Sequence, residues 1–274
     1  MPRDIHLLIV DPQNDFMDAA PGGTPALPVP GAAADMQRLA AFIDAAADAI
    51  TAITVTFDSH HRYHIAHPTF WRTGDGAPVA PFTQIRAADV RAGRFEPRDA
   101  RQRERALAYV DELERQGRYV LMVWPVHCEL GSWGHNAFPA VRAAYNRWED
   151  RHLAVVQKVS KGSNPFTEHY SALQAEVPDP HDPGTELNRR LIAELDQAGW
   201  IVIAGEASSH CVLATTEHLA AGLPSGRCDK IVLLSDCMSP VAGFEEQARD
   251  FLERMRSRGA QVMTSAQALR LLVP

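Results

Sequence analysis

Short apolar runs alternate along this chain with longer segments that have the periodicity of helices. Most of the runs are continuous rather than alternating, which is typical of strands buried on both faces of a parallel sheet. The predicted strands cover residues 5–10, 53–57, 119–123, 153–156, 200–204, 230–234 and 261–263. The predicted helices cover residues 32–50, 98–116, 185–198, 208–221 and 244–258.

Glycine ends several of the predicted helices, at Gly117, Gly199, Gly222 and Gly259. Glycine adopts the left-handed conformation at a helix C-terminus without a steric penalty. All of these glycines except Gly222 lead within a residue or two into a predicted strand, and this order indicates βαβ units. We therefore expect a three-layer α/β/α fold with a mostly parallel sheet. We expect one domain over residues 1–274, with an enlarged insertion at about residues 73–117.

The net charge is −7, from 34 acidic and 27 basic residues, which gives no reason to expect a nucleic-acid or membrane partner. No stretch approaches the roughly 18 uninterrupted apolar residues of a membrane helix. The N-terminal apolar run is too short for a signal peptide. The cysteines, Cys128, Cys211, Cys228 and Cys237, form no CxxC pair and indicate free thiols in a reducing compartment. We expect a soluble cytoplasmic protein.

Residues with useful chemistry stand at or just after the ends of the predicted strands. They are Asp11, Asp58, His127, Lys161 and Cys211. In open parallel sheets, ligands bind outside the carboxyl ends of the strands. The sequence therefore predicts that these residues converge on one site.

Cys211 lies at a strand-to-helix turn, in the first turn of the predicted helix. The positive end of a helix and its unpaired N–H groups favour a thiolate and can donate to an oxyanion. A buried structural cysteine is the alternative, and taken alone Cys211 fits that description too. The structural description suits Cys228 and Cys237 better, because neither stands at such a turn.

Asp11 and Lys161 are candidate partners of the cysteine. A carboxylate at the end of a buried strand can have a raised pKa, as a general base requires. The alternative for an aspartate here is a turn or cap residue, a role that suits Asp15 better than Asp11. A lysine near a thiolate and a carboxylate would stabilise both, although taken alone Lys161 fits an ordinary solvated lysine.

A histidine cluster follows Asp58. Its members are His60, His61, His64 and His67. Carboxylate and neutral imidazole groups together suit zinc, iron or manganese, and His127 stands at another strand end. The spacing predicts a metal site but fixes no single ligand set. Trp124, close to His127, could stack on a flat substrate or belong to the core.

Several different short motifs follow one another along most of the chain. They are IVDPQNDF at 9–16, DSH at 58–60, WPVHC at 124–128, KG at 161–162, YSA at 170–172 and GEASSHC at 205–211. This pattern resembles the isochorismatase-like cysteine hydrolases, and within them the nicotinamidases. The resemblance implies an isochorismatase-like, Rossmann-like fold with a six-stranded parallel sheet.

The resemblance also implies roles for particular residues. The catalytic triad would be Asp11, Lys161 and Cys211, because Lys161 has the following glycine that the nearby Lys158 lacks. The metal ligands would be Asp58, His60 and His127, with His64 as a fourth ligand that some members use. A cis peptide would join Glu206 to Ala207, and the N–H groups of Ala207 and Cys211 would form the oxyanion hole. Phe16, Trp124 and Tyr170 would bind the substrate.

The activity that this implies is hydrolysis of a small, ring-bearing amide, above all nicotinamide, to its acid and ammonia through a thioester. One divalent metal ion, zinc or else iron or manganese, and a homo-oligomer are also implied. N-carbamoyl, ureido or maleamate substrates are alternatives, since Ser59 and Glu206 depart from the family pattern. A vinyl-ether hydrolase, which would lack the nucleophilic cysteine, and a non-catalytic metal or ligand sensor are further alternatives.

Overall fold

The computed structural model describes residues 4–272 and centres on a six-stranded sheet in the order β10-β9-β8-β1-β2-β7. Every neighbouring pair of strands in this sheet is parallel. The strands are β1 (Ile5–Val10), β2 (Ile50–Asp58), β7 (Gln157–Lys161), β8 (Trp200–Gly205), β9 (Ile231–Leu234) and β10 (Gln261–Met263). The predicted parallel α/β fold is confirmed.

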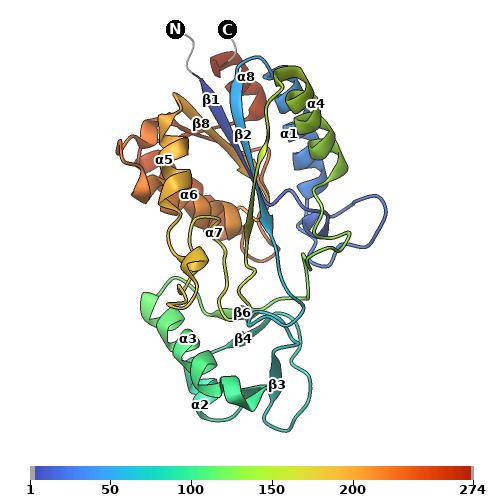
Figure 1. Cartoon of the computed structure of the whole chain (residues 1–274), viewed down its shortest axis with the longest axis vertical. Helices are drawn as coiled ribbons and strands as arrows, with labels where there is room; N and C mark the ends of the chain where they lie inside the picture. The colour runs from blue at the N-terminus through green and yellow to red at the C-terminus, as the bar shows by residue number, and fades with distance from the viewer. Residues whose placement is uncertain (1–3, 273–274) are drawn as a thin grey trace.

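Helices cover both faces of the sheet (Figure 1). On one face, α1 (Ala32–Ala45) contacts α4 (Pro139–His152) and α8 (Ser265–Leu272). On the other face, α5 (Arg189–Gln197) contacts α6 (Cys211–Gly222), and α7 (Glu245–Ser257) contacts β10. The sheet is therefore enclosed, and all six residues of the central strand β1 are buried, as its continuous apolar run predicts.

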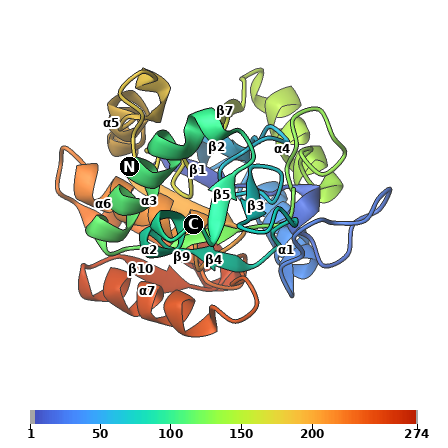
Figure 2. The same cartoon turned by 90° about the horizontal axis from the view of Figure 1, so that it is seen from below.

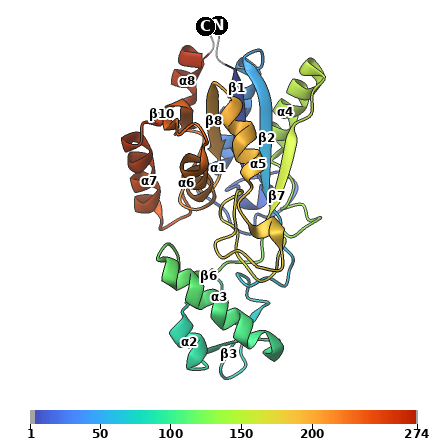
Figure 3. The ribbon, with the colours of Figure 1, turned by 60° about the vertical axis from the view of Figure 1, so that its left-hand side comes forward.

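Residues 71–123 form a smaller part of the molecule, here called the lower region, at the end opposite the termini (Figures 1 and 3). Two antiparallel strand pairs and two helices build it. They are β3 (Trp71–Thr73) with β5 (Phe95–Pro97), β4 (Thr83–Ile85) with β6 (Leu121–Val123), α2 (Ala87–Arg91) and α3 (Arg103–Gln116). The strands of the main sheet run toward this region, and Figure 2 looks at it from below. The carboxyl ends of the main strands therefore face the lower region.

Short 3-10 turns complete the described elements, at Asn14–Phe16, Ala100–Gln102, Pro183–Thr185 and Cys228–Lys230. Gly117 ends α3 in the left-handed conformation, with φ 70°, as the sequence predicts. No helix within residues 4–272 has both the length and the apolar character needed to cross a membrane.

Two of the strand predictions are wrong. The apolar run at 119–123 does not join the main sheet, because its strand β6 pairs antiparallel with β4. The run at 153–156 is not a strand: Leu153 ends α4 with φ 50°, and Leu153 and Val155 are 93% and 85% exposed. The strand follows directly as β7, and α4 before it was not predicted.

Candidate active site

The carboxyl ends of three neighbouring strands bring the predicted chemical groups together. Asp11 follows β1, Asp58 ends β2 and Lys161 ends β7. Cys211 is the first residue of α6, which follows β8 on the other side of β1. All of these side chains are buried.

Lys161 connects the predicted triad. Its Nζ lies 3.0 Å from Asp11 Oδ2, 3.6 Å from Cys211 Sγ and 2.9 Å from Asp58 Oδ1. Asp11 Oδ1 also accepts a hydrogen bond from Thr56 Oγ1 at 2.5 Å. The structure thus brings Asp11, Lys161 and Cys211 into one buried group, with Asp58 attached to it.

Burial sets the protonation of this group. It raises the pKa of the Cys211 thiol well above its usual range, and the ammonium of Lys161 offsets only part of the rise. Burial also raises the pKa of Asp11, against the charge of Lys161. For Lys161, burial would lower the pKa, but the charges of Asp11 and Asp58 raise it well above its usual value. The directions of these shifts favour a protonated thiol beside a charged Lys161.

The backbone before Cys211 turns sharply. A Cβ at Gly205, where φ is +133°, would lie 2.0 Å from the Val10 carbonyl oxygen, so only glycine allows β8 to approach β1 here. Ala207 is left-handed, with φ 60°. The expected cis peptide between Glu206 and Ala207 is wrong, since residues 4–272 contain no cis bond. The trans form is strongly preferred before a residue other than proline, and the left-handed Ala207 supplies the turn.

Helix α6 begins at Cys211 and not at the predicted residue 208, but Cys211 lies in its first turn, as predicted, so the Cys211 N–H is one of the N–H groups that the helix leaves unpaired. The Ala207 carbonyl accepts hydrogen bonds from the N–H groups of His210 and Val212. These bonds hold the loop against the helix. The use of the Ala207 and Cys211 N–H groups as an oxyanion hole stays a prediction.

Asp58, His60 and His127 form a possible metal site, with ligand atoms within 4.8 Å of one another. Asp58 Oδ2 lies 2.9 Å from His60 Nε2 and 3.2 Å from His127 Nε2. The other ring nitrogens face carbonyl oxygens, His60 Nδ1 that of Gly162 at 3.2 Å and His127 Nδ1 that of Pro125 at 2.8 Å. Hydrogen bonds of this kind orient histidine ligands and leave Nε2 for a cation.

Gln13 and Gly162 shape this group. Gln13 Nε2 donates to the Asp58 carbonyl at 2.8 Å, and the Asp58 N–H donates to Gln13 Oε1 at 2.7 Å. A Cβ at Gly162, where φ is +82°, would lie 2.9 Å from His60 Cε1 and 3.1 Å from Asp58 Oδ1. Gly162 therefore leaves the room that both ligand side chains need.

His67, which the sequence analysis did not assign as a ligand, belongs to the same cluster. His60, His64 and His67 also have ligand atoms within 4.8 Å of one another. Both ring nitrogens of His67 are buried without a partner, whereas His64 Nε2 faces the Thr167 carbonyl and His64 Nδ1 accepts from the Ala66 N–H. Burial and the neighbouring His60 lower the pKa of His67 to about 2. His67 is therefore a neutral ring with one nitrogen lone pair that no hydrogen bond uses, and a candidate fourth ligand beside His64.

The charge around this cluster fits a divalent cation. The carboxyl groups of Asp11, Asp58 and Glu168 are buried there with the single ammonium of Lys161. Burial would raise the pKa of Asp58, but His60 and Lys161 hold it well below its usual range. Carboxylate and neutral imidazole donors suit zinc, iron or manganese. The donor set and the orphaned nitrogens of His67 are thus those of a metal site.

Phe16, Trp124 and Tyr170, the predicted substrate residues, line one cavity together with Cys211. Trp124 Nε1 donates to Tyr170 Oη at 3.1 Å, which fixes the two rings relative to each other. The cavity has a volume of only about 20 Å³, enough for about one water molecule. A ring-bearing ligand therefore requires side chains of the wall to move.

His210 and Glu168 also line this cavity, and the sequence analysis assigned neither. The ring of His210 lies 5.3 Å from that of Trp124 and 5.1 Å from that of Tyr170. The Glu168 N–H donates to Tyr109 Oη at 3.2 Å. The position of His210 beside the nucleophile was a usable signal, whereas a lone glutamate in a loop carries none.

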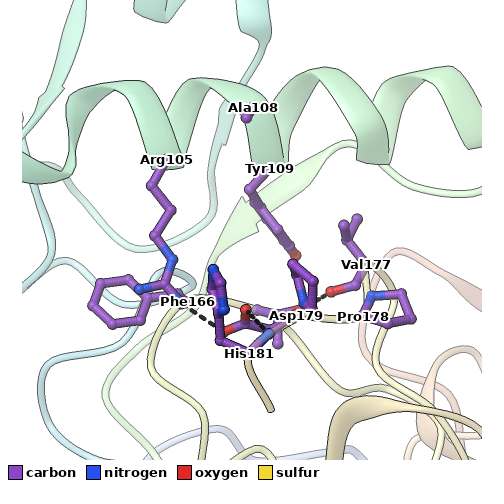
Figure 4. A pocket seen from close by; sticks show the side chains of 10 residues that line it. Arg105, Ala108, Tyr109, Phe166, Val177, Pro178, Asp179 and His181 are labelled. Carbon is purple, nitrogen blue, oxygen red and sulfur yellow. Dashed lines mark hydrogen bonds and ion pairs between the residues drawn. The ribbon is translucent and has the colours of Figure 1, made fainter. Parts of the chain in front are cut away.

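A second, larger cavity of about 450 Å³ lies between α3 and the segment that follows Phe166 (Figure 4). Arg105 lies over the Phe166 ring, 3.7 Å from its centroid, and its Nη2 lies 2.5 Å from Asp179 Oδ2. Tyr109 lines this cavity, and Thr167 separates Phe166 from Glu168 of the catalytic cavity. None of the predicted site residues lines the larger cavity.

The remaining candidates have structural surroundings. Lys158 Nζ lies 3.7 Å from Glu149, and its side chain is 48% exposed. The Asp15 carboxylate accepts hydrogen bonds from the N–H groups of Ala26 and Cys128, which confirms its role in holding turns. Lys158 and Asp15 therefore stand outside the buried triad.

Comparison by sequence finds no protein-family model that matches the chain. No curated protein matches it at the sequence level either. Comparison of structures gives a different result, because many solved chains share its fold.

The structure of the yeast nicotinamidase Pnc1p bound to the inhibitor nicotinaldehyde has a TM-score of 0.64 at 20% identity, covering 95% of this chain and 99% of that one. The pyrazinamidase of Pyrococcus horikoshii in complex with zinc has a TM-score of 0.56 at 21% identity, covering 95% and 99%. An isochorismatase-like hydrolase from Alkaliphilus metalliredigens has a TM-score of 0.53 at 17% identity, covering 98% of each chain. The likeness establishes that this chain has the isochorismatase-like fold found in nicotinamidases.

Proposed function

We propose that this chain is a cysteine-dependent amidohydrolase that converts a small, planar amide to its acid and ammonia, with nicotinamide as the leading substrate. The observation that carries this is the position of Lys161 Nζ, 3.0 Å from Asp11 and 3.6 Å from Cys211. A base, a cation and a nucleophile thus share one buried contact, as covalent catalysis requires. The solved neighbours include a nicotinamidase and a pyrazinamidase, which favours a ring-bearing amide.

The first step is attack on the amide carbonyl. Asp11 accepts the proton of the Cys211 thiol as the sulfur forms a bond to the carbonyl carbon. This base is needed because burial keeps the thiol protonated at neutral pH. The ammonium of Lys161 stabilises the carboxylate and the thiolate as the proton moves. N–H groups at the start of α6 offer donors to the oxyanion.

The second step releases ammonia. Asp11 returns the proton to the amide nitrogen, the carbon–nitrogen bond breaks, and an acyl thioester remains on Cys211. Asp11 then accepts a proton from a water molecule as the oxygen of that water attacks the thioester carbon. The carbon–sulfur bond breaks, the acid leaves, and the thiol is restored. Two lower barriers replace one high barrier, which is the advantage of the covalent route.

A divalent cation would be held by Asp58, His60 and His127, with His67 beside them, and would supply a Lewis acid next to the substrate. The donor atoms and the buried carboxylates support this part of the proposal. The zinc in the Pyrococcus horikoshii pyrazinamidase makes zinc the first metal to test.

The test is ammonia release from nicotinamide by the purified protein, with metal content measured on the same sample. We expect release that depends on Cys211, and about one metal ion per chain. Cys211→Ala should abolish release and keep the metal. Cys237→Ala is the matched control, since Cys237 is also fully buried but lines neither cavity.

Turnover by Cys211→Ala would refute the covalent route. Metal without release from nicotinamide would move the search to ureido, N-carbamoyl and maleamate amides. No release from any of these would refute the amidohydrolase.

A further inference from the structure

Phe82 combines a strained backbone conformation with an aromatic side chain that is exposed to water. Its φ is 64°, in the left-handed region that suits glycine and strains a bulky side chain. Its side chain is also 56% exposed, the only aromatic ring among the large hydrophobic side chains exposed within residues 4–272. Packing into the core explains neither property. Phe82 lies in the turn that leads into β4, where glycine would suit the φ better, so a bulky exposed residue at this position is a reason to look for a function.

Three of the five left-handed residues other than glycine within residues 4–272 lie at the candidate active site. The five residues are Asp11, Phe82, Cys128, Leu153 and Ala207. Asp11 and Ala207 belong to the site itself, Cys128 follows the ligand His127, and Leu153 ends helix α4. Phe82 remains to be explained.

Strand pairing places Phe82 beside the catalytic cavity. In the antiparallel pair of β4 and β6, Thr83 is opposite Val123, and the Phe82 N–H donates to the Val123 carbonyl at 2.5 Å. Phe82 therefore falls opposite Trp124. The two rings meet edge to face, with centroids 6.0 Å apart and an interplanar angle of 86°.

Trp124 is nearly buried and lines the cavity of Cys211, whereas Phe82 is on the water side of it. The rings of His210, Trp124 and Phe82 thus form an aromatic path from the residue beside the nucleophile to the surface. The cavity itself holds only about 20 Å³. A substituent that extends from the cavity past Trp124 would meet the Phe82 ring.

We infer that Phe82 is a specificity-determining residue, which packs on an apolar or aromatic substituent that the substrate carries outside the catalytic cavity. This inference rests on the proposed amidohydrolase function and adds to it a class of substrate: ring amides with an apolar group. An exposed phenylalanine edge gives such a group a partner at little conformational cost.

The experiment compares nicotinamide with its derivatives that carry a phenyl group at each ring carbon in turn. The variants are Phe82→Ala, Phe82→Leu and Phe82→Gly, because glycine suits this φ and keeps the fold if alanine does not. Leu271→Ala is the matched control, a 52% exposed side chain on α8, at the far end of the molecule from β4 (Figure 1).

We expect the wild-type protein to hydrolyse at least one phenyl derivative as efficiently as nicotinamide. Phe82→Ala and Phe82→Gly should lower kcat/KM for that derivative by about tenfold, mainly through KM, and change nicotinamide by less than about twofold. Phe82→Leu should restore part of the loss, and Leu271→Ala should change neither substrate.

Equal losses for both substrates, or no loss, would overturn the inference. Hydrolysis of nicotinamide with no phenyl derivative accepted would also overturn it, and would leave the amidohydrolase intact. Failure of the wild-type protein to hydrolyse any of these amides would overturn the proposed function and this inference together.

Discussion

Two cavities lie on either side of the chain at Thr167 and Glu168, and they differ in size and in chemistry. The outer cavity, under α3, has a volume of about 450 Å³, and the catalytic cavity has about 20 Å³. In the outer cavity, Arg105 forms an ion pair with Asp179, and the Arg105 side chain is about half exposed. Beside the inner one, which Asp58 and Cys211 line, the ion pairs of Lys161 are buried on both sides.

In this molecule the smaller cavity, and not the larger one, adjoins the buried charges. A charge at an exposed rim is screened by water and has little effect on the pKa of neighbouring groups. A buried charge changes the protonation of the groups it touches, as Lys161 does for Asp11 and Cys211. Five substitutions, one of them a matched control, test this contrast.

The largest effect should come from Lys161→Met. The substitution leaves the carboxylates of Asp11 and Asp58 buried without their cation, and breaking a buried ion pair costs about 3–5 kcal/mol. Turnover should fall by at least about a thousandfold. Chemical denaturation and ammonia release would measure the two effects.

Lys158→Met is the matched control on the same strand, because Lys158 is half exposed. It should change stability by less than about 1 kcal/mol. An equal effect of the two substitutions would contradict the contrast between buried and exposed charge.

The next effect concerns pH and a buried group outside both cavities. His6 hydrogen-bonds only the neutral Thr54 hydroxyl, at 2.8 Å, and burial lowers its pKa from 6.5 to about 4. The unfolded chain then binds more protons than the folded one between pH 6.5 and about 4. The contribution of His6 to the free energy of unfolding is fully present above pH 6.5. It is lost as the pH falls toward about 4, and the total loss is about 3 kcal/mol.

Urea denaturation between pH 4 and pH 7.5 would measure this slope, and His6→Gln should remove most of it. An unchanged slope in the variant would show that the acid sensitivity arises elsewhere. The result would separate acid effects on stability from acid effects on Asp11 in the catalytic cavity.

A smaller effect should follow Tyr109→Phe in the wall between the cavities. The Tyr109 hydroxyl accepts from the buried Glu168 N–H at 3.2 Å, and the loss of that acceptor should cost about 1–3 kcal/mol. Because no charge is lost, kcat/KM should stay within a factor of about three. Thermal denaturation together with kinetics would show whether the wall matters for stability or for turnover.

The smallest effect should come from Arg105→Met in the outer cavity. The ion pair with Asp179 is partly exposed and the guanidinium lies over Phe166, so the loss should be about 1 kcal/mol or less. Ammonia release should be unchanged. A loss of turnover above about tenfold would mean that the outer cavity belongs to the catalytic apparatus, and would end the contrast.

Much of the fold could be predicted because central strands are buried on both faces and leave an apolar run in the sequence. Strand β7 left no such run, since it lies at the edge of the sheet and its residues before the buried Lys161 alternate between partial burial and exposure. The apolar run of β6 predicted a strand, but an apolar run does not indicate which strand it pairs with. Its partner β4 is a local strand of the lower region.

The site could be predicted in part for similar reasons. Asp11 follows β1, Lys161 ends β7 and Cys211 begins α6. The topology of the sheet brings these positions together. The choice between His64 and His67 depends on which ring nitrogens find partners in the folded chain, and no spacing shows this. The strain at Phe82 likewise appears only in the backbone of the folded protein.

The two oxygens of Asp58 serve different neighbours. Oδ1 accepts from Lys161, and Oδ2 lies against His60 and His127. An asparagine has the same shape but only one accepting oxygen, so whichever way its amide turned, either the lysine or the histidines would face an N–H group. Loss of either oxygen at position 58 therefore disturbs the histidine cluster or the lysine, and one carboxylate ties the two groups together.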